Sequence, residues 1–226
     1  LLQQGRNVAD VAYFHGEEAP LTALYAQAPL ADVPVRYAYD FVNAEALQHV
    51  LSVEAGELVA KSGARYRLLF LGGTSHHMTL PVLQRIASLV EAGATVVGNA
   101  PQGSPALADD PAAFAALVKR LWPGAPVATI GRGRVIAGSD VEAALAAINV
   151  NPDFQYDKPR PDSEILFVHR KIEGGEIYFV NNRRNRAESV AARFRVTGRK
   201  PEIWRADTGA IEPVSYRIVG SETLVP

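Results

Sequence analysis

The sequence contains no cysteine. Disulfides, thiolate zinc sites and a cysteine nucleophile are therefore all excluded. A functional glutamine amidotransferase is excluded on the same ground, because its chemistry requires a thiolate. The lack of cysteine does not determine the cellular compartment, since many secreted bacterial enzymes also lack cysteine.

An excess of either charge is also missing, because 23 basic residues face 24 acidic ones and the formal net charge is −1. With no basic run, we expect no nucleic-acid partner and no binding to a membrane surface. The longest apolar runs, such as residues 68–71, are far too short to span a bilayer. Hydrophobic residues make up 48% of the chain, which excludes disorder and can fill a core.

Both ends of the sequence favour a piece of a larger protein. Leu1 to Gln4 followed by Gly5 is typical of the last turn of a helix and its terminating glycine. We recognise no signal-peptide pattern in the first residues of the sequence. Residues 221–226 end within an expected strand.

Residues 1–150 alternate between short apolar strands and amphipathic helices. This alternation predicts a doubly wound, mainly parallel α/β sheet of the flavodoxin-like or amidotransferase-like kind, with helices on both faces. A capping box at Ser139 and Glu142 is expected to open the last helix. The expected strands are 8–14, 35–42, 65–71, 94–98, 126–130 and 133–136; the expected helices are 20–27, 43–51, 80–91, one from 110, and 139–148; a hairpin is expected over 52–64.

The pattern changes in residues 151–226. Pro152, Pro159 and Pro161 indicate a polar linker, and tightly spaced strands separated by turn signals follow. These predict the start of an antiparallel β-sandwich, cut short at residue 226.

Three polar segments follow the first three strands, at residues 15–18, 40–45 and 72–77. Ligands of open parallel sheets bind beyond the carboxyl ends of the strands, so these segments are the candidate site. Their carboxylates suit general acid–base chemistry or binding of a hard cation.

A purely structural interpretation competes, and spacing alone favours it. Glu17 and Glu18 precede a helix opened by Pro20, where carboxylates favour the positive end of the helix dipole. Asn43 suits a helix cap and Glu45 the first turn behind it.

Other motifs are weaker. Ser75 follows a strand, but its surroundings lack the second glycine of a nucleophile elbow. His76 and His77 are adjacent and no third zinc ligand is evident in the sequence. The glycines around Arg132 indicate a turn, since the third glycine of a dinucleotide fingerprint is absent. Residues 181–186 are rich in arginine and predict a solvated loop.

Taken in order, several segments resemble glycoside hydrolase family 106, the α-L-rhamnosidases. The matching stretches are residues 1–14, 16–20, 39–47, 66–75, 78–83, 91–98, 177–181 and 194–198. The resemblance implies a missing N-terminal (β/α)8-type catalytic barrel, then this α/β layer, then β-sandwich domains. It also implies an inverting, calcium-dependent enzyme acting on a rhamnose-containing glycan or glycoside, with a periplasmic or secreted location favoured.

Carried over by motif position, the resemblance makes Glu45 the expected general base and Glu17 the runner-up. Asp40, Asn43 and His76 are the expected substrate contacts, and Glu17 and Glu18 the expected calcium ligands. The general acid is expected on the missing barrel, so we expect no glycosidase activity from these 226 residues alone. The alternative is a non-catalytic α/β scaffolding or carbohydrate-binding module.

Overall fold

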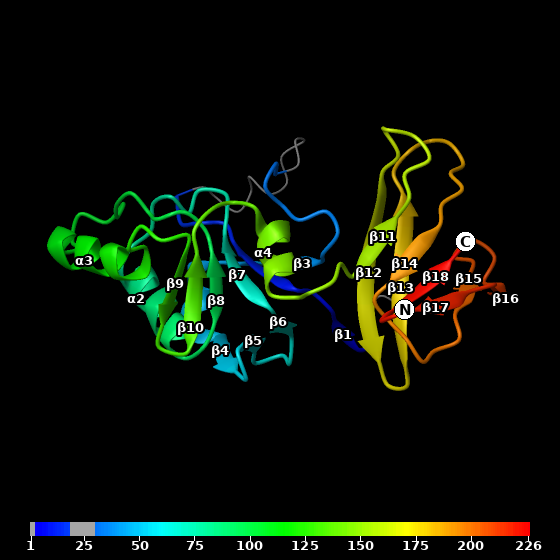
Figure 1. Ribbon diagram of the computed structural model, residues 1–226, viewed down its shortest axis with the longest axis horizontal. Helices are drawn as coiled ribbons and strands as arrows, with labels where there is room; N and C mark the ends of the chain where they lie inside the picture. The colour runs from blue at the N-terminus through cyan, green and yellow to red at the C-terminus, as the bar shows by residue number, and fades with distance from the viewer. Residues whose placement is uncertain (1–2, 19–29) are drawn as a thin grey trace. The chain divides into compact units, whose positions relative to one another are not determined.

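The computed structural model describes residues 3–18 and 30–226, and its chain forms two compact units (Figure 1). One unit is Ala9–Val150; the other combines Asn151–Pro226 with the residues up to Val8. The strand β1 (Arg6–Asn7) pairs antiparallel with Lys171 and Arg170, whereas the sequence-based division assigns it to the α/β part. Among the described residues, no helix has the length and apolar character needed to cross a membrane.

A six-stranded sheet forms the centre of the α/β unit. Its order is β3-β2-β7-β8-β10-β9; neighbours are parallel from β3 to β10, and β9 runs antiparallel at the edge. The strands of this sheet are β2 (Val11–Phe14), β3 (Tyr39–Val42), β7 (Leu68–Leu71), β8 (Thr95–Val97), β9 (Val127–Ile130) and β10 (Gly133–Ile136). A small second sheet consists of β4 (Leu51–Glu54), β5 (Glu57–Ala60) and β6 (Arg65–Tyr66). The helices are α1 (Ala44–His49), α2 (Leu80–Glu91), α3 (Pro111–Leu121) and α4 (Val141–Ala147).

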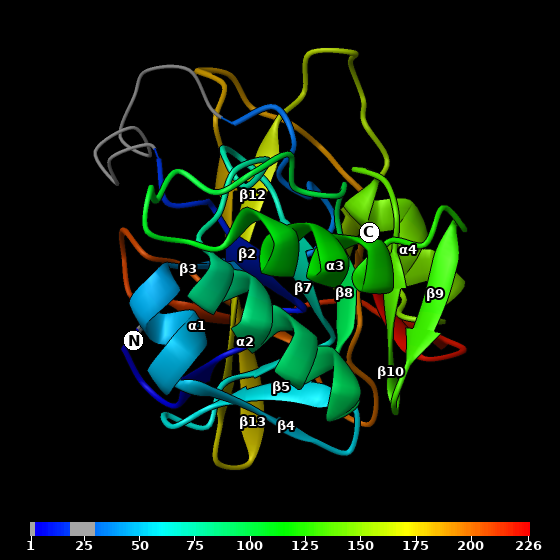
Figure 2. The same cartoon turned by 90° about the vertical axis from the view of Figure 1, so that its left-hand side faces the viewer.

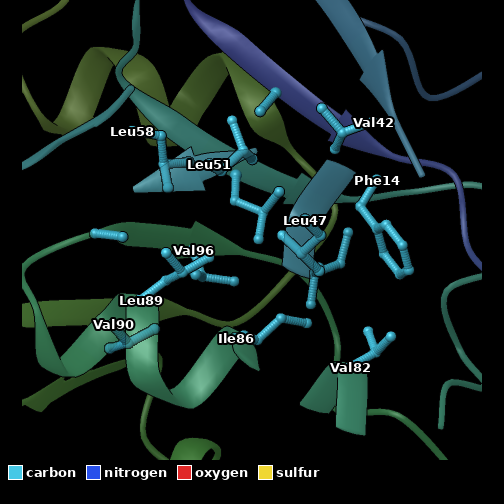
Figure 3. Close-up of a cluster of buried hydrophobic side chains, with 14 of the residues drawn as sticks. Phe14, Val42, Leu47, Leu51, Leu58, Val82, Ile86, Leu89, Val90 and Val96 are labelled. Atoms are coloured by element: carbon cyan, nitrogen blue, oxygen red, sulfur yellow. The ribbon is translucent and has the colours of Figure 1, made fainter. Parts of the chain in front are cut away.

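The central strands are buried on both faces. Side chains alternate along a strand, so Ala12 and Phe14 of β2 enter one core cluster while Val11 and Tyr13 enter the other. Helices α1, α2 and α3 lie along one face of the sheet (Figure 2), and apolar side chains of all three enter the larger cluster. Figure 3 shows the part of this cluster that includes Leu47 of α1 and Ile86 of α2. The smaller cluster receives Val141 and Leu145 from α4.

The predicted elements of this unit form with some changes. The strand expected over residues 65–71 is divided, since Arg65–Tyr66 pair with β5 while Leu68–Leu71 join the main sheet. The expected turn at Ala55 and Gly56 is confirmed; both have positive φ angles, of 49° and 83°. The helix expected over residues 20–27 lies outside the described residues.

The predicted capping box at Ser139 is wrong. Asp140 caps α4 instead, accepting a hydrogen bond from the Ala143 N–H. The Glu142 carboxylate accepts three bonds from Val35 and Arg36. Burial acts to raise the pKa of Glu142, but these hydrogen bonds outweigh it and hold the pKa below its usual value.

The second unit consists of antiparallel sheets. In the first sheet, β12 (Ile165–Ile172) pairs with β1 and with β13 (Gly175–Asn182). The second sheet consists of β11 (Phe154–Tyr156), β14 (Ala192–Phe194), β18 (Glu222–Val225) and β17 (Arg217–Val219). A hairpin is formed by β15 (Glu202–Trp204) and β16 (Ile211–Pro213). The predicted linker is therefore partly wrong, because β11 lies within it. Phe154 packs with Ile165 and Ala192, so side chains from both larger sheets share one core.

A buried polar network lies in this second unit. His169 is 3% exposed; its Nδ1 lies 2.8 Å from Asp153 and its Nε2 lies 2.7 Å from Glu176. The Tyr178 hydroxyl donates a hydrogen bond to Asp153, and the rings of Tyr178 and His169 stack with their centroids 4.0 Å apart. Burial acts to lower the pKa of His169, but the two carboxylates outweigh it and raise the pKa.

Candidate functional site

The carboxyl ends of β2, β3 and β7 meet at one edge of the main sheet. In the strand register, Phe14 lies opposite both Val42 and Leu71. The polar segments that follow these strands therefore begin at the same level. The expectation that the three segments share one edge is confirmed.

Glu17 is held at the start of α2. Its carboxylate accepts a hydrogen bond from the Thr79 N–H at 2.7 Å and another from the Thr79 hydroxyl at 3.1 Å. Backbone N–H groups at a helix start lack partners within the helix, and a carboxylate there also meets the positive end of the helix dipole. Thr79, the expected cap, makes no side-chain cap bond. Both oxygens of Glu17 thus contribute to the structure of this helix start.

Asp109 completes the same helix start, although no pattern in the sequence predicted this role. Its Oδ2 accepts from the Leu80 N–H at 2.6 Å and from the Ser104 hydroxyl. The hydrogen bond from Leu80, followed by that from Ser104, holds the pKa of Asp109 below its usual value. Two carboxylates from distant segments therefore bind successive N–H groups of α2.

Asn43 and Glu45 lie at the start of α1. The Asn43 side chain accepts a hydrogen bond from the Ala46 N–H at 2.8 Å, so the predicted cap is confirmed. Glu45 is exposed in the first turn of α1. No residue within 3–18 or 30–226 forms a hydrogen bond or ion pair with its carboxylate. Of the two expected general bases, Glu45 has the freer carboxylate.

Asp40 is half-buried in β3, where its Oδ2 accepts from the Tyr66 hydroxyl at 3.0 Å. Burial of the Tyr66 ring, reinforced by the Asp40 charge, raises the pKa of this phenol. Tyr66 therefore stays a neutral donor. The contact joins β3 to β6, so Asp40 has a structural role beside any role in substrate binding.

The carboxylate of Glu18 lies close to both of the adjacent histidines. Its Oε2 is 3.1 Å from Nδ1 of His77 and 3.8 Å from Nε2 of His76. The two imidazole rings have centroids 4.6 Å apart. Each of the three side chains has one nitrogen or oxygen atom that could bind a metal ion, and these three atoms all lie within 4.8 Å of one another. The fold thus brings a third side chain with a potential metal-ligating atom, Glu18, to the two histidines, which the sequence pattern did not show.

Two further residues at this edge had no predicted role: His15 lies in one of the three candidate segments, and Asp32 lies in none of them. Asp32 accepts from the Tyr13 hydroxyl at 2.7 Å and from the Gly73 N–H at 3.0 Å, which links the segment before β3 to the end of β7. His15 is 3% exposed, and its Nδ1 has no hydrogen-bond partner among the residues that the structure describes. An isolated Asp in a loop and a His after an apolar strand carry no signal that spacing could detect.

The weaker motifs have structural roles. Ser75 is 5% exposed and its N–H donates to the Gly72 carbonyl, as in a turn. Gly131 and Gly133 lie at the β9–β10 hairpin, against Glu91 and Ala94. The arginine-rich loop is paired with carboxylates, since Arg186 binds both Asp162 and Glu188.

Comparison with known proteins places this geometry in a family. The family model described as alpha-L-rhamnosidase, of glycoside hydrolase family 106, matches residues 1–218. The chain belongs to glycoside hydrolase family 106. A rhamnosidase of solved structure, from Novosphingobium sp. PP1Y, is 52% identical in sequence to this family 106 chain. The two structures match with a TM-score of 0.93, over 99% of this chain and 22% of the rhamnosidase chain.

A second relative carries a different name. A protein of Formosa agariphila named "Putative beta-glucuronidase" is 36% identical over 217 residues, which are 94% of this family 106 chain and 17% of the relative. The chain thus spans about a fifth of the length of each of these relatives. Both names describe enzymes that cleave glycosidic bonds, and the sugar differs between them.

The predicted calcium ligands offer few oxygens. Calcium takes six to eight oxygen ligands. Both oxygens of Glu17 bind Thr79, and the Glu18 carboxylate is grouped with two imidazole nitrogens and with no second carboxylate among the described residues. The described surroundings of Glu17 and Glu18 therefore do not fit a calcium ion.

Proposed function

We propose that this chain is one part of a larger glycoside hydrolase that removes terminal α-L-rhamnosyl groups with inversion. The match of the family 106 model over residues 1–218 carries the proposal. The similarity to a rhamnosidase of known structure supports rhamnose as the sugar. Its partner is accordingly a rhamnose-containing glycan or glycoside.

In this proposal the edge carrying Glu45 forms one wall of the active site. Inversion requires a general base and a general acid whose carboxyl groups are about 6.5–9.5 Å apart, which leaves room for the attacking water. Glu45 is the proposed base, because it is exposed and its carboxylate is free of partners within the described residues. Glu17 is the weaker choice, since Thr79 occupies both of its oxygens. The general acid would come from the catalytic barrel that the family resemblance implies.

The test uses the full-length enzyme with the Glu45→Gln change. An aryl α-L-rhamnoside should be hydrolysed with kcat lowered by about 10²–10⁴-fold, the usual contribution of general acid–base catalysis. The matched control is Glu173→Gln, an exposed glutamate in the β12–β13 turn, which should keep wild-type activity. Activity near wild type in Glu45→Gln would remove Glu45 as the base.

Two further measurements test which sugar is removed and whether the anomeric configuration is inverted. The full-length enzyme should turn over the aryl α-L-rhamnoside and leave an aryl β-glucuronide intact. NMR of the first-formed sugar should show the β-anomer of rhamnose. Hydrolysis of the glucuronide alone would instead favour the activity named for the Formosa agariphila relative.

The proposal includes a flavodoxin-like, doubly wound class for the α/β unit and a β-sandwich class for the other. In chain order the parallel strands β2, β3, β7, β8 and β10 occupy sheet positions that give the order 2-1-3-4-5, which is that of flavodoxin-like folds. Helices contribute to core clusters on both faces. A calcium requirement and a periplasmic or secreted location stay predictions for the whole protein, drawn from the resemblance alone.

A non-catalytic role in scaffolding or carbohydrate binding is the second candidate. The hydrogen bonds of Glu17 and Asn43 favour it, because both side chains secure helix starts. This candidate predicts that Glu45→Gln leaves kcat unchanged in the full-length enzyme. An effect confined to KM would then indicate sugar binding.

A further inference from the structure

The cluster of Glu18, His76 and His77 combines two imidazoles with one carboxylate at the edge of the main sheet. We propose that these three residues form a binding site for a divalent transition-metal ion of the Zn²⁺ class. Two imidazole nitrogens and one carboxylate oxygen are a common protein ligand set for zinc, with a fourth position left to water. The proposal is independent of the rhamnosidase activity.

The spacing of the three ligand atoms suits a small ion. Zinc bonds to nitrogen and oxygen of about 2.0–2.2 Å imply ligand atoms about 3.4 Å apart in a tetrahedral site. The carboxylate oxygen of Glu18 lies 3.1 Å from one histidine nitrogen and 3.8 Å from the other. The whole group fits within 4.8 Å, so a small closing movement of the His76 ring completes the geometry.

The backbone around the ligands is fixed on both sides. The Gln102 N–H donates to the His76 carbonyl at 2.7 Å, and the Met78 N–H donates to the Gly103 carbonyl at 3.2 Å. On the other side, the residue before Glu18 is anchored by the two bonds between Glu17 and Thr79. The backbone that carries the three side chains is therefore held in place before an ion binds, so only the side chains themselves have to be ordered.

Nitrogen donors decide which ion the site prefers. Imidazole suits zinc, copper and nickel, whereas calcium and magnesium prefer oxygen ligands. Glu18 is the single carboxylate in the cluster that the described residues form. The three side chains are 35–50% exposed, so an ion can reach them from solvent. Once bound, it would link the segment after β2 to the segment after β7.

The test measures Zn²⁺ bound to the full-length protein after removal of metals with a chelator. Wild type should hold one more equivalent of zinc than the His76→Ala/His77→Ala double variant. The matched control is His49→Ala, an exposed histidine at the end of α1, which should bind as wild type does. Zinc should also raise the melting temperature of wild type but not that of the double variant.

Two further experiments sharpen the result. Glu18→Gln should weaken zinc binding by about tenfold or more. Losses of about that size in metal affinity already follow when a residue that only hydrogen-bonds to a metal ligand is replaced. A large excess of Ca²⁺ should leave the zinc bound. Equal zinc content and affinity in wild type and the double variant, with matching circular dichroism and melting temperature in chelator, would overturn the proposal. Complete displacement of zinc by Ca²⁺ would overturn it as well.

Discussion

Gly72 at the end of β7 illustrates how single residues constrain this fold. A Cβ added at Gly72 would lie 2.4 Å from the Cζ and hydroxyl of Tyr13. Tyr13 is fully buried, and its hydroxyl is held by Asp32. The buried and hydrogen-bonded ring therefore has little freedom to move away from an added Cβ.

The change Gly72→Ala should therefore destabilise the protein by about 1–3 kcal/mol, the usual cost of overpacking. The matched control is Gly175→Ala, where the added Cβ would meet Ile172 at 3.5 Å, an ordinary contact. Neither glycine has a positive φ, so backbone strain does not separate the two changes. Chemical denaturation measures both free energies of unfolding; equal values for the two variants would contradict the steric argument.

At the same scale, the side chains that receive hydrogen bonds were the hardest to assign. The cap at Asn43 was predictable, because its partner is the N–H of Ala46 in the same turn. The partners of Glu17 and Glu18 were not, since they lie 59 to 62 residues away. Spacing alone predicts local pairs, and distant pairs need the strand order first.

Among the elements, α2 has its start secured by side chains from outside the helix. Thr79 and Leu80 donate their N–H groups to Glu17 and Asp109, which come from opposite directions along the chain. The helix lies over the sheet with Val82, Leu83 and Ile86 in the core. Loosening its first turn should reduce the packing of that core.

Glu17→Ala should thus lower the free energy of unfolding by about 1–3 kcal/mol, because it leaves the Thr79 N–H without its charged partner. Glu17→Gln keeps an acceptor and should lose less, about 0.3–1 kcal/mol from the interaction with the helix dipole. Glu45→Gln serves as the control and should stay within about 0.5 kcal/mol of wild type. Denaturation curves give all three values; a loss in Glu45→Gln as large as in Glu17→Ala would contradict this assignment.

Elements with a strong local pattern were predicted well, and those defined by distant pairing were not. Helix α2 begins at Leu80 and ends at Glu91, as its apolar face indicates. Strand β11 escaped notice because three residues between prolines carry no alternation, and its pairing with β14 alone defines it. The first strand, β1, is likewise defined by β12.

At the scale of the whole molecule, the His169 network makes stability depend on pH. Because the folded-state pKa of His169 is raised, its contribution is complete below the unfolded pKa of about 6.5. That contribution is lost as the pH rises through the folded-state pKa. The pKa of Glu176 is lowered, through its hydrogen bond to His169 first, so its contribution is lost as the pH falls through the folded value.

We therefore expect the antiparallel unit to be most stable in mildly acidic solution and to weaken toward alkaline pH. His169→Gln cannot titrate and removes the charged partner that His169 offers to Asp153 and Glu176, although Asp153 keeps Tyr178 and Arg195. It should be destabilised by about 1–3 kcal/mol and lose this part of the pH dependence. His49→Ala is the control, since its ring is exposed. Urea denaturation between pH 5 and pH 9 gives the slopes. An unchanged slope in His169→Gln would contradict the assignment to this network.

The pairing of β1 with β12 also sets an order of events during synthesis. Gly5 and Arg170 touch although 165 residues separate them, so the α/β unit is an insertion within the antiparallel one. At a translation rate of about 5–20 residues per second, β1 waits roughly 10–30 seconds for its partner strand to leave the ribosome. The inserted unit emerges complete in that interval. The antiparallel unit, in which β1 is synthesised before the α/β unit and β12 after it, is therefore the later of the two to close.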